Sequence, residues 1–175
     1  MPFAPAPIRS NMQPAWTIKR LRRWSSERSI TSRQSITTSY VENADTVYHF
    51  PPGTKQRLLD YIQRNFETAK KAFQAGVHLI VGSDAVYNGW GLNMRELDWF
   101  VKMGMTPEQA LKAATTEPAA MLGMEKSLGA VAPGFYADIV AVQGDPLANI
   151  TAVSKRENIR WVMKAGRVVV DKAAR

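Results

Sequence analysis

Hydrophobic residues recur at helical spacing between residues 54 and 75. Charged or polar side chains occupy the other faces of this segment. The six apolar residues on one face are Leu58, Leu59, Ile62, Phe66, Ala69 and Phe73. Intervals of three and four residues are typical of an amphipathic helix that packs one face on a core. Gly76 follows as a C-terminal cap, because glycine readily adopts the left-handed conformation that ends a helix. The apolar run from Val77 to Val81 then predicts a short buried strand that ends at Gly82 and Ser83.

Further helices are predicted between this strand and residue 123. The first begins near Asn93 and ends at Gly104. The next begins at Thr106-Pro107-Glu108-Gln109, which combines an N-cap threonine, a proline at the first helical position and a capping-box glutamine. A short helix from Pro118 to Gly123 follows. A helix that returns directly into a buried strand is half of a βαβ unit, so the fold class is predicted to be α/β.

The rest of the chain differs at both ends. Residues 126–175 consist of short β segments with turns, and the Ala165-Gly166 pair in IRWVMKAGRVVV predicts a terminal hairpin. Residues 1–40 are rich in Pro, Ser, Thr, Arg and Gln and show little periodicity, so we expect them to be weakly ordered. The pattern therefore divides the chain into residues 1–40, 41–125 and 126–175.

Charge changes this picture little. Residues 1–40 hold seven basic residues and one acidic residue, so they carry six of the eight net positive charges. The remainder is nearly neutral, and we expect no nucleic-acid partner. The lack of cysteine excludes disulfides and thiolate metal sites. Since no apolar run approaches the ~18 residues of a membrane-spanning helix and no signal peptide is visible, we expect no membrane partner and a cytoplasmic location.

One carboxylate follows the buried strand directly. The run GVHLIVGSDA places Asp84 just after the strand end. A serine and an aspartate after a strand are also ordinary turn residues. From the residues alone, Asp84 is therefore either a turn residue or part of a site.

Four stretches follow one another along the chain: AGVHLIVGSDA, NMRELDWFVKMGMTPEQALKAATTEPAAMLG, LGAVAPGFYADIVAVQGDPL and VMKAGRVVV. In this order and spacing they resemble the C-terminal third of the metal-dependent amidohydrolase superfamily, in particular its imidazolonepropionase-like and Xaa-Pro dipeptidase-like branch. The resemblance covers about residues 55 to 172 and leaves residues 1–40 without a counterpart. It implies that residues 41–125 are the last βα units of a (β/α)8 TIM barrel with a helical cap, and residues 126–175 the C-terminal strands of a small composite β-sandwich. It also implies hydrolysis of amide, cyclic amide or other C–N bonds through a metal-activated water.

The resemblance implies roles for individual residues. Asp84 falls on the aspartate that closes the eighth barrel strand, which binds the divalent metal, expected to be zinc, and accepts the proton of the attacking water. Asn88, Trp90 and Asn93 fall in the loop over the site and would line the pocket for a small-molecule substrate. His49 precedes a helix whose start belongs on the same rim, so it is a candidate rim residue.

The family's other metal ligands have no counterpart here. The chain has no His-x-His pair, and its two histidines are His49 and His78. His78 lies six residues before Asp84, about 20 Å along an extended strand, so these two cannot share a metal. Because zinc sites take three or four protein ligands, we expect a C-terminal fragment that is inactive alone and is completed by an N-terminal polypeptide or in a homo-oligomer. The alternative is a non-catalytic interaction module that binds a partner supplying the rest of the barrel.

Overall fold

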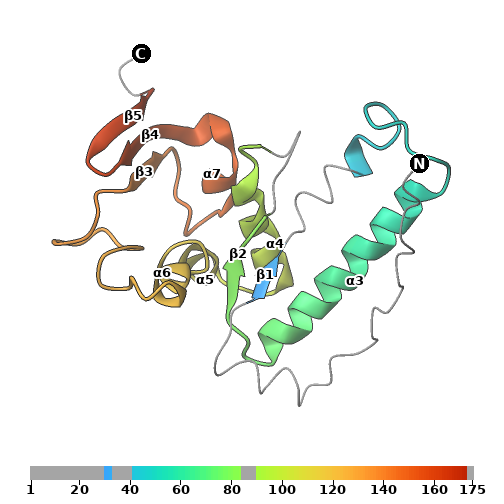
Figure 1. Cartoon of the computed structure of the whole chain (residues 1–175), viewed down its shortest axis with the longest axis horizontal. Helices are drawn as coiled ribbons and strands as arrows, with labels where there is room; N and C mark the ends of the chain where they lie inside the picture. The colour runs from blue at the N-terminus through green and yellow to red at the C-terminus, as the bar shows by residue number, and fades with distance from the viewer. Residues whose placement is uncertain (1–29, 33–40, 84–89, 173–175) are drawn as a thin grey trace, which may run out of the picture.

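The computed structural model of the protein describes residues 30–32, 41–83 and 90–172. Two predicted site residues, Asp84 and Asn88, lie outside the described residues. In chain order the elements are β1 (Ile30–Ser32), α3 (Thr54–Gln74), β2 (Leu79–Val81), η2 (Asn93–Arg95), α4 (Glu96–Met103), α5 (Pro107–Lys112), α6 (Thr116–Met121), β3 (Ile139–Val142), α7 (Thr151–Ser154), η3 (Arg156–Asn158), β4 (Ile159–Lys164) and β5 (Arg167–Asp171). Figure 1 shows α3 on one side, β1, β2 and α4 to α6 in the middle, and the β3 to β5 sheet on the other side.

The parallel pair of β1 and β2 positions the candidate site. Ile30 lies opposite Leu79, and Ser32 lies opposite Val81. Parallel strands need a crossover connection, and α3 lies between the two strands in the chain. The described residues therefore contain a βαβ arrangement, which confirms the predicted α/β class.

β1 differs from the expectation for residues 1–40. The sequence predicts weak order throughout that segment, whereas residues 30–32 form a strand. The strand depends on backbone pairing with β2, which follows it only after α3. Such a non-local pairing leaves no periodic signal in a three-residue stretch, so the local pattern could not predict it.

The long amphipathic helix is confirmed. α3 spans Thr54–Gln74, and Gly76 follows it with a φ angle of 80°. On its inner face Ile62 and Ala72 are buried, and the Phe66 ring packs edge-on against Trp99 of α4 with 5.7 Å between ring centroids. None of the helices among the described residues is both long and apolar enough to span a membrane.

The three predicted helices that follow β2 are also present. Gly104 ends α4 with a φ angle of 117°. At the start of α5, the Thr106 hydroxyl accepts from the Gln109 backbone N–H, and the Gln109 side chain accepts from the Thr106 N–H, so the predicted capping box is confirmed. α6 begins at Thr116, two residues before the predicted start.

The core lies between these helices and β2. Its buried residues are Ala72, Val77, Leu79, Leu97, Phe100, Met103, Met105, Ala110, Ala113 and Ile150. The Val81 backbone N–H donates to the Ala113 carbonyl at 2.9 Å, which ties the end of α5 to β2. Strand β2 is therefore held by β1, by apolar packing and by this hydrogen bond.

The C-terminal strands form a separate antiparallel sheet in the order β3-β4-β5. β4 and β5 are joined by Ala165 and Gly166, whose φ angles are 48° and 78°. Two consecutive residues with positive φ form the tight turn that matches the twist of a hairpin, so the predicted terminal hairpin is confirmed.

Candidate functional site

The carboxyl end of β2 leads directly to the candidate catalytic residue. Ser83 follows the strand, is 4% exposed and immediately precedes Asp84. The Asn93 side chain donates from Nδ2 to Ser83 Oγ at 2.8 Å. The structure therefore places Asn93, one of the predicted pocket residues, beside the strand end that carries Asp84.

Trp90 is also described, at the far end of the segment that follows β2. Its side chain is 70% exposed. The next residue, Gly91, has a φ angle of 79°, and a Cβ atom built on it would lie 3.4 Å from the Arg156 guanidinium carbon. Trp90 is therefore largely open to solvent, and the Arg156 guanidinium lies close to the next residue, Gly91.

Arg156 is a residue near this segment that the sequence did not identify. It belongs to η3, 65 positions after Gly91. The contact depends on how elements distant in sequence pack together. α7 precedes η3 and lies against α4. The Ser154 hydroxyl of α7 donates to both carboxylate oxygens of Asp98 in α4, at 3.1 and 3.0 Å. No motif in the sequence signals a lone arginine of this kind.

His49, the candidate rim residue, is exposed and has a φ angle of 47°. Within the described part of the chain, the structure assigns it no hydrogen bond or ion pair. The flanking rings of Tyr48 and Phe50 stack on each other with 5.2 Å between centroids. The described contacts thus do not bring His49 together with Ser83 or Asn93.

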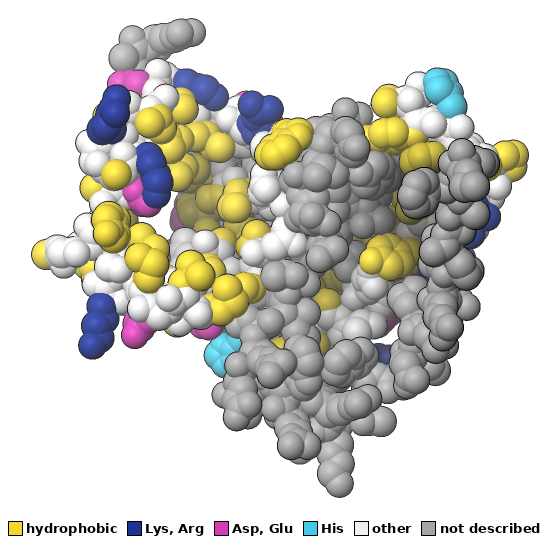
Figure 2. Space-filling view, in the orientation of Figure 1, with side chains coloured by type: hydrophobic (Ala, Val, Ile, Leu, Met, Phe, Trp, Pro, Cys, Tyr) yellow, Lys and Arg dark blue, Asp and Glu magenta, His cyan; other side chains and the backbone are white. Residues whose placement is uncertain are grey.

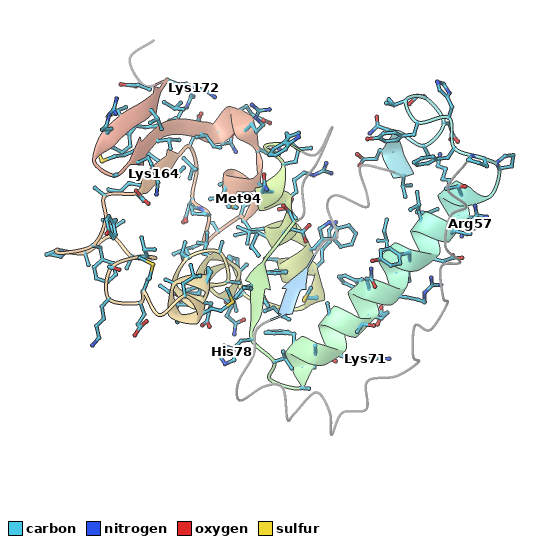
Figure 3. The ribbon with its side chains drawn as sticks, in the orientation of Figure 1. Arg57, Lys71, His78, Met94, Lys164 and Lys172 are labelled. Carbon is cyan, nitrogen blue, oxygen red and sulfur yellow. The ribbon has the colours of Figure 1, made fainter. Side chains whose placement is uncertain are left out.

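His78 lies at the other end of β2. It precedes the strand, whereas Ser83 follows it, and Figure 3 shows His78 and Met94 toward opposite ends of β2. Its Nδ1 atom lies 3.0 Å from Oε2 of Glu117. His78 is therefore separated from Ser83 by the whole of β2, in keeping with its position six residues before Asp84 in the sequence.

The described residues do not form a metal site on their own. Over residues 30–32, 41–83 and 90–172, no three or more His, Asp or Glu side chains gather where they could hold a metal ion. The donor set that zinc requires is therefore not met within this part of the chain. No catalytic step through a metal follows from these residues alone.

One acidic group with a shifted pKa lies in the C-terminal sheet. Asp138 accepts from the Lys164 ammonium group and, at 2.7 Å, from the Ala165 backbone N–H. The hydrogen bond from Lys164, followed by that from Ala165, lowers the pKa of the Asp138 carboxyl below its ordinary value. Asp138 therefore fastens the start of β3 to the β4–β5 turn, which is a structural role.

A strand of a parallel pair that is followed in the sequence by a carboxylate matches the active-site rim of a β/α barrel, where catalytic residues come from the carboxyl ends of the strands. The chain belongs to the amidohydrolase family, whose model matches residues 29–169. The match begins before β1, so the family resemblance also includes residues 29–40, for which the sequence suggested no counterpart.

The similar proteins are hydrolases by name. The chain is 32% identical over 99 residues to ochratoxinase from Aspergillus niger, covering 55% of this chain and 20% of that protein. It is 29% identical over 133 residues to imidazolonepropionase from Symbiobacterium thermophilum, covering 73% of this chain and 30% of that protein. Among solved structures it resembles a Xaa-Pro dipeptidase with methionine bound in the active site, at 26% identity and a TM-score of 0.73, covering 87% of this chain and 37% of that one. These likenesses confirm the predicted branch and imply a TIM-barrel fold.

The chain spans a minor part of each of these proteins, from 20% of ochratoxinase to 37% of the dipeptidase. Family members hydrolyse amide bonds of small molecules and generally use a divalent metal.

Proposed function

We propose that this chain forms the C-terminal part of a metal-dependent amidohydrolase that hydrolyses an amide or cyclic amide bond of a small molecule. The observation that carries the proposal is the family match over residues 29–169, which includes the βαβ arrangement and the strand that leads to Asp84. In barrels of this kind the active site forms at the carboxyl ends of the strands. Asp84 follows the carboxyl end of β2 in the sequence.

In this proposal Asp84 binds the metal and accepts a proton from the attacking water. An ionised carboxylate serves both purposes, because it is an oxygen ligand and a base. Trp90 and Asn93, together with Asn88, line the substrate side of the rim. The bond from Asn93 to buried Ser83 supports this assignment, since it fixes Asn93 at the strand end.

The remaining metal ligands would come from polypeptide outside this sequence. The chain spans 30% of the imidazolonepropionase it matches, and its two histidines are His49 and His78. Neither histidine contacts Ser83 or Asn93 among the described contacts. The chain alone is therefore expected to show no hydrolytic turnover above background.

The proposal is tested by supplying an N-terminal polypeptide that carries the remaining metal ligands. The purified chain is mixed with the N-terminal portion of the Symbiobacterium imidazolonepropionase that precedes the matched region, dialysed against trace zinc, and analysed for metal by mass spectrometry and for hydrolysis of the ring amide of imidazolonepropionate. We expect stoichiometric zinc and turnover in the mixture, and loss of both with Asp84→Asn.

Asp60→Asn is the matched control. Asp60 is an exposed carboxylate of α3 that accepts from Gln56 at 2.9 Å, so the substitution removes one negative charge without changing a residue of the proposed site. It should leave zinc binding unchanged. Equal zinc content in Asp84→Asn and in the unmodified chain would remove Asp84 from the metal site.

A second candidate function is a non-catalytic module that binds the polypeptide completing the barrel. It is favoured by exposed apolar side chains on the C-terminal sheet, where Val140, Val168 and Val169 are 57%, 49% and 59% exposed. Figure 2 shows hydrophobic side chains gathered over this sheet and over the segment between α6 and β3. Exposed strands with apolar side chains promote association, so this module would form complexes or oligomers. A chain that sediments as a monomer at every concentration would count against it.

A further inference from the structure

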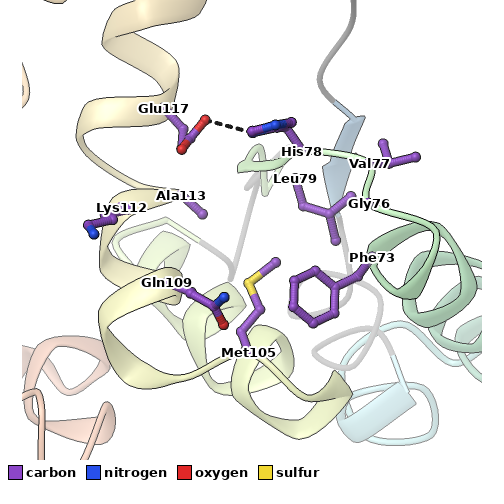
Figure 4. A pocket seen from close by; sticks show the side chains of 10 residues that line it. All are labelled: Phe73, Gly76, Val77, His78, Leu79, Met105, Gln109, Lys112, Ala113 and Glu117. Carbon is purple, nitrogen blue, oxygen red and sulfur yellow. Dashed lines mark hydrogen bonds and ion pairs between the residues drawn. The ribbon is translucent and has the colours of Figure 1, made fainter. Parts of the chain in front are cut away.

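A pocket of about 210 Å³ opens at the amino-terminal end of β2, between the end of α3 and the helices α5 and α6. Figure 4 shows its lining side chains. It lies at the opposite end of β2 from Ser83 and uses none of the residues proposed for hydrolysis. Its volume is below the ~300–1,000 Å³ of sites for drug-sized ligands, so it suits a molecule with one ring or one short branched chain.

One end of the pocket is apolar. It is lined by the Phe73 ring from α3, by Leu79 of β2 and by Met105, which precedes α5. Leu79 and Met105 are 3% and 6% exposed, so they are held by the core rather than by solvent contacts. A methionine sulfur and an aromatic ring together favour an aromatic or branched aliphatic group.

The other end carries a carboxylate held in place. Oε2 of Glu117 lies 3.0 Å from Nδ1 of His78, and the side chain of Glu117 is 37% exposed. An ionised carboxylate only accepts hydrogen bonds, so Nδ1 is the donor in this pair and Oε1 remains as an acceptor site. The nearby Lys112 ammonium binds Glu108 at 2.6 Å, and Figure 4 shows Lys112 directed away from His78 and Glu117. Lys112 also lines the pocket, but its ammonium group is paired with Glu108, so the carboxylate of Glu117 is the lining group that can accept hydrogen bonds from a cation.

Gln109 also lines the pocket. Its Oε1 accepts from the Thr106 backbone N–H at 2.9 Å, which is one half of the capping box of α5. Glutamate serves equally well at this capping position. Gln109→Glu therefore adds a second carboxylate to the pocket while it preserves the local helix structure.

We propose that this pocket binds a small primary ammonium ion that carries an aromatic or branched aliphatic group. The ammonium group donates to Glu117, whose carboxylate is oriented by His78. The apolar group packs on Phe73, Leu79 and Met105. A primary ammonium suits the site because it is compact and offers several hydrogen-bond donors to one carboxylate, as lysine does in proteins.

The chain offers a direct spectroscopic test, because His49 and His78 are its two histidines. The full chain is titrated with 2-phenylethylammonium while the two imidazole signals are followed by NMR, with His78→Gln used for assignment. We expect a saturable shift of the His78 signal at millimolar concentration and an unchanged His49 signal. 2-Phenylethanol and phenylacetate, which replace the ammonium by a hydroxyl or a carboxylate, should bind about two- to fivefold more weakly or not at all.

Two variants should change the affinity for the amine in opposite directions. Glu117→Gln should weaken binding of the amine about two- to fivefold, as expected for loss of a partly exposed ion pair. Gln109→Glu should strengthen it by a similar factor, and Glu125→Gln, at an exposed carboxylate outside the pocket, should leave it unchanged. Circular dichroism checks that each variant is folded, and Gln109→Glu decides the question if Glu117→Gln does not fold.

The proposal is overturned if the His78 signal shows no saturable shift up to about 20 mM amine. It is also overturned if the alcohol binds as tightly as the amine, or if neither carboxylate variant changes the affinity. None of these results bears on zinc binding or hydrolysis at the other end of β2.

Discussion

Asn93 donates a hydrogen bond from Nδ2 to Oγ of Ser83 at 2.8 Å. The two residues flank the segment of residues 84–92, which begins with Asp84 and ends next to η2. Ser83 is 4% exposed, so its hydroxyl depends on a protein partner. The bond therefore joins the end of β2 to the start of η2.

Asn93→Ala should lower the free energy of unfolding by about 1 kcal/mol, because it leaves the buried Ser83 hydroxyl without its described partner. Denaturant unfolding of the single variants and of the Asn93→Ala/Ser83→Ala double variant measures this. The double-mutant cycle should give a coupling of about 0.5–1.5 kcal/mol. A coupling near zero would show that the bond does not hold the two ends together.

Asp138 should make stability depend on pH in the acid range. Its pKa is lowered in the folded chain from an ordinary value of 3.8, mainly by the hydrogen bond from Lys164. The ionised form is thus favoured by folding, and the stabilisation is present above pH 3.8 and is lost as the pH falls through the lowered pKa. We expect the difference in unfolding free energy between the chain and its Asp138→Asn variant to shrink as the pH falls from about 6 to about 3.

Asp60→Asn is a useful comparison for this experiment, because Asp60 is an exposed carboxylate whose described hydrogen bond comes from an uncharged side chain, that of Gln56. If the two variants showed the same pH dependence, the contacts of Asp138 with Lys164 and Ala165 would not be its cause.

Local signals explain why much of the fold could be predicted. The spacing of apolar residues in α3, the Thr106–Gln109 capping box and the Ala165-Gly166 turn each depend on residues close in sequence. β1 was not predicted, because it is defined by pairing with β2 across the whole of α3. The contact of Arg156 with Gly91 was missed for the same reason.

The candidate site was predicted in a different way. A serine and an aspartate after a strand leave a turn residue and a metal ligand equally open, and the family resemblance, not local chemistry, favours the ligand role of Asp84. The family match to residues 29–169 supports that resemblance. The metal partners of Asp84 could not be predicted from this sequence. The described residues likewise contain no group of three or more side chains suited to a metal.

Thr106→Ala should destabilise the chain by about 1 kcal/mol, because it removes the side-chain acceptor of the Gln109 N–H. Thr106→Ser keeps a hydroxyl at the N-cap and should restore most of this stability. Thermal unfolding of both variants measures the effect. Equal losses in the two variants would mean that the methyl group of Thr106, rather than its hydroxyl, is what matters.

A side chain at Gly129 should lower the free energy of unfolding for two separable reasons. Its φ angle is 88°, and a Cβ atom there would lie 2.7 Å from the Thr115 carbonyl oxygen and 2.9 Å from the Thr116 Cα atom. These are backbone atoms at the start of α6, so relief requires the segment or the helix to move. Gly134 has a similar φ angle of 86° with nothing within 4 Å of its Cβ position, so Gly134→Ala measures the conformational cost alone.

We expect Gly134→Ala to cost about 1–2 kcal/mol and Gly129→Ala a further ~1–3 kcal/mol from steric overlap. Denaturant unfolding of both variants under the same conditions gives the difference. Equal costs would mean that the segment carrying Gly129 shifts freely away from α6. A larger cost at Gly129 would show that the segment leading to β3 is held tightly against the helices that pack on β2.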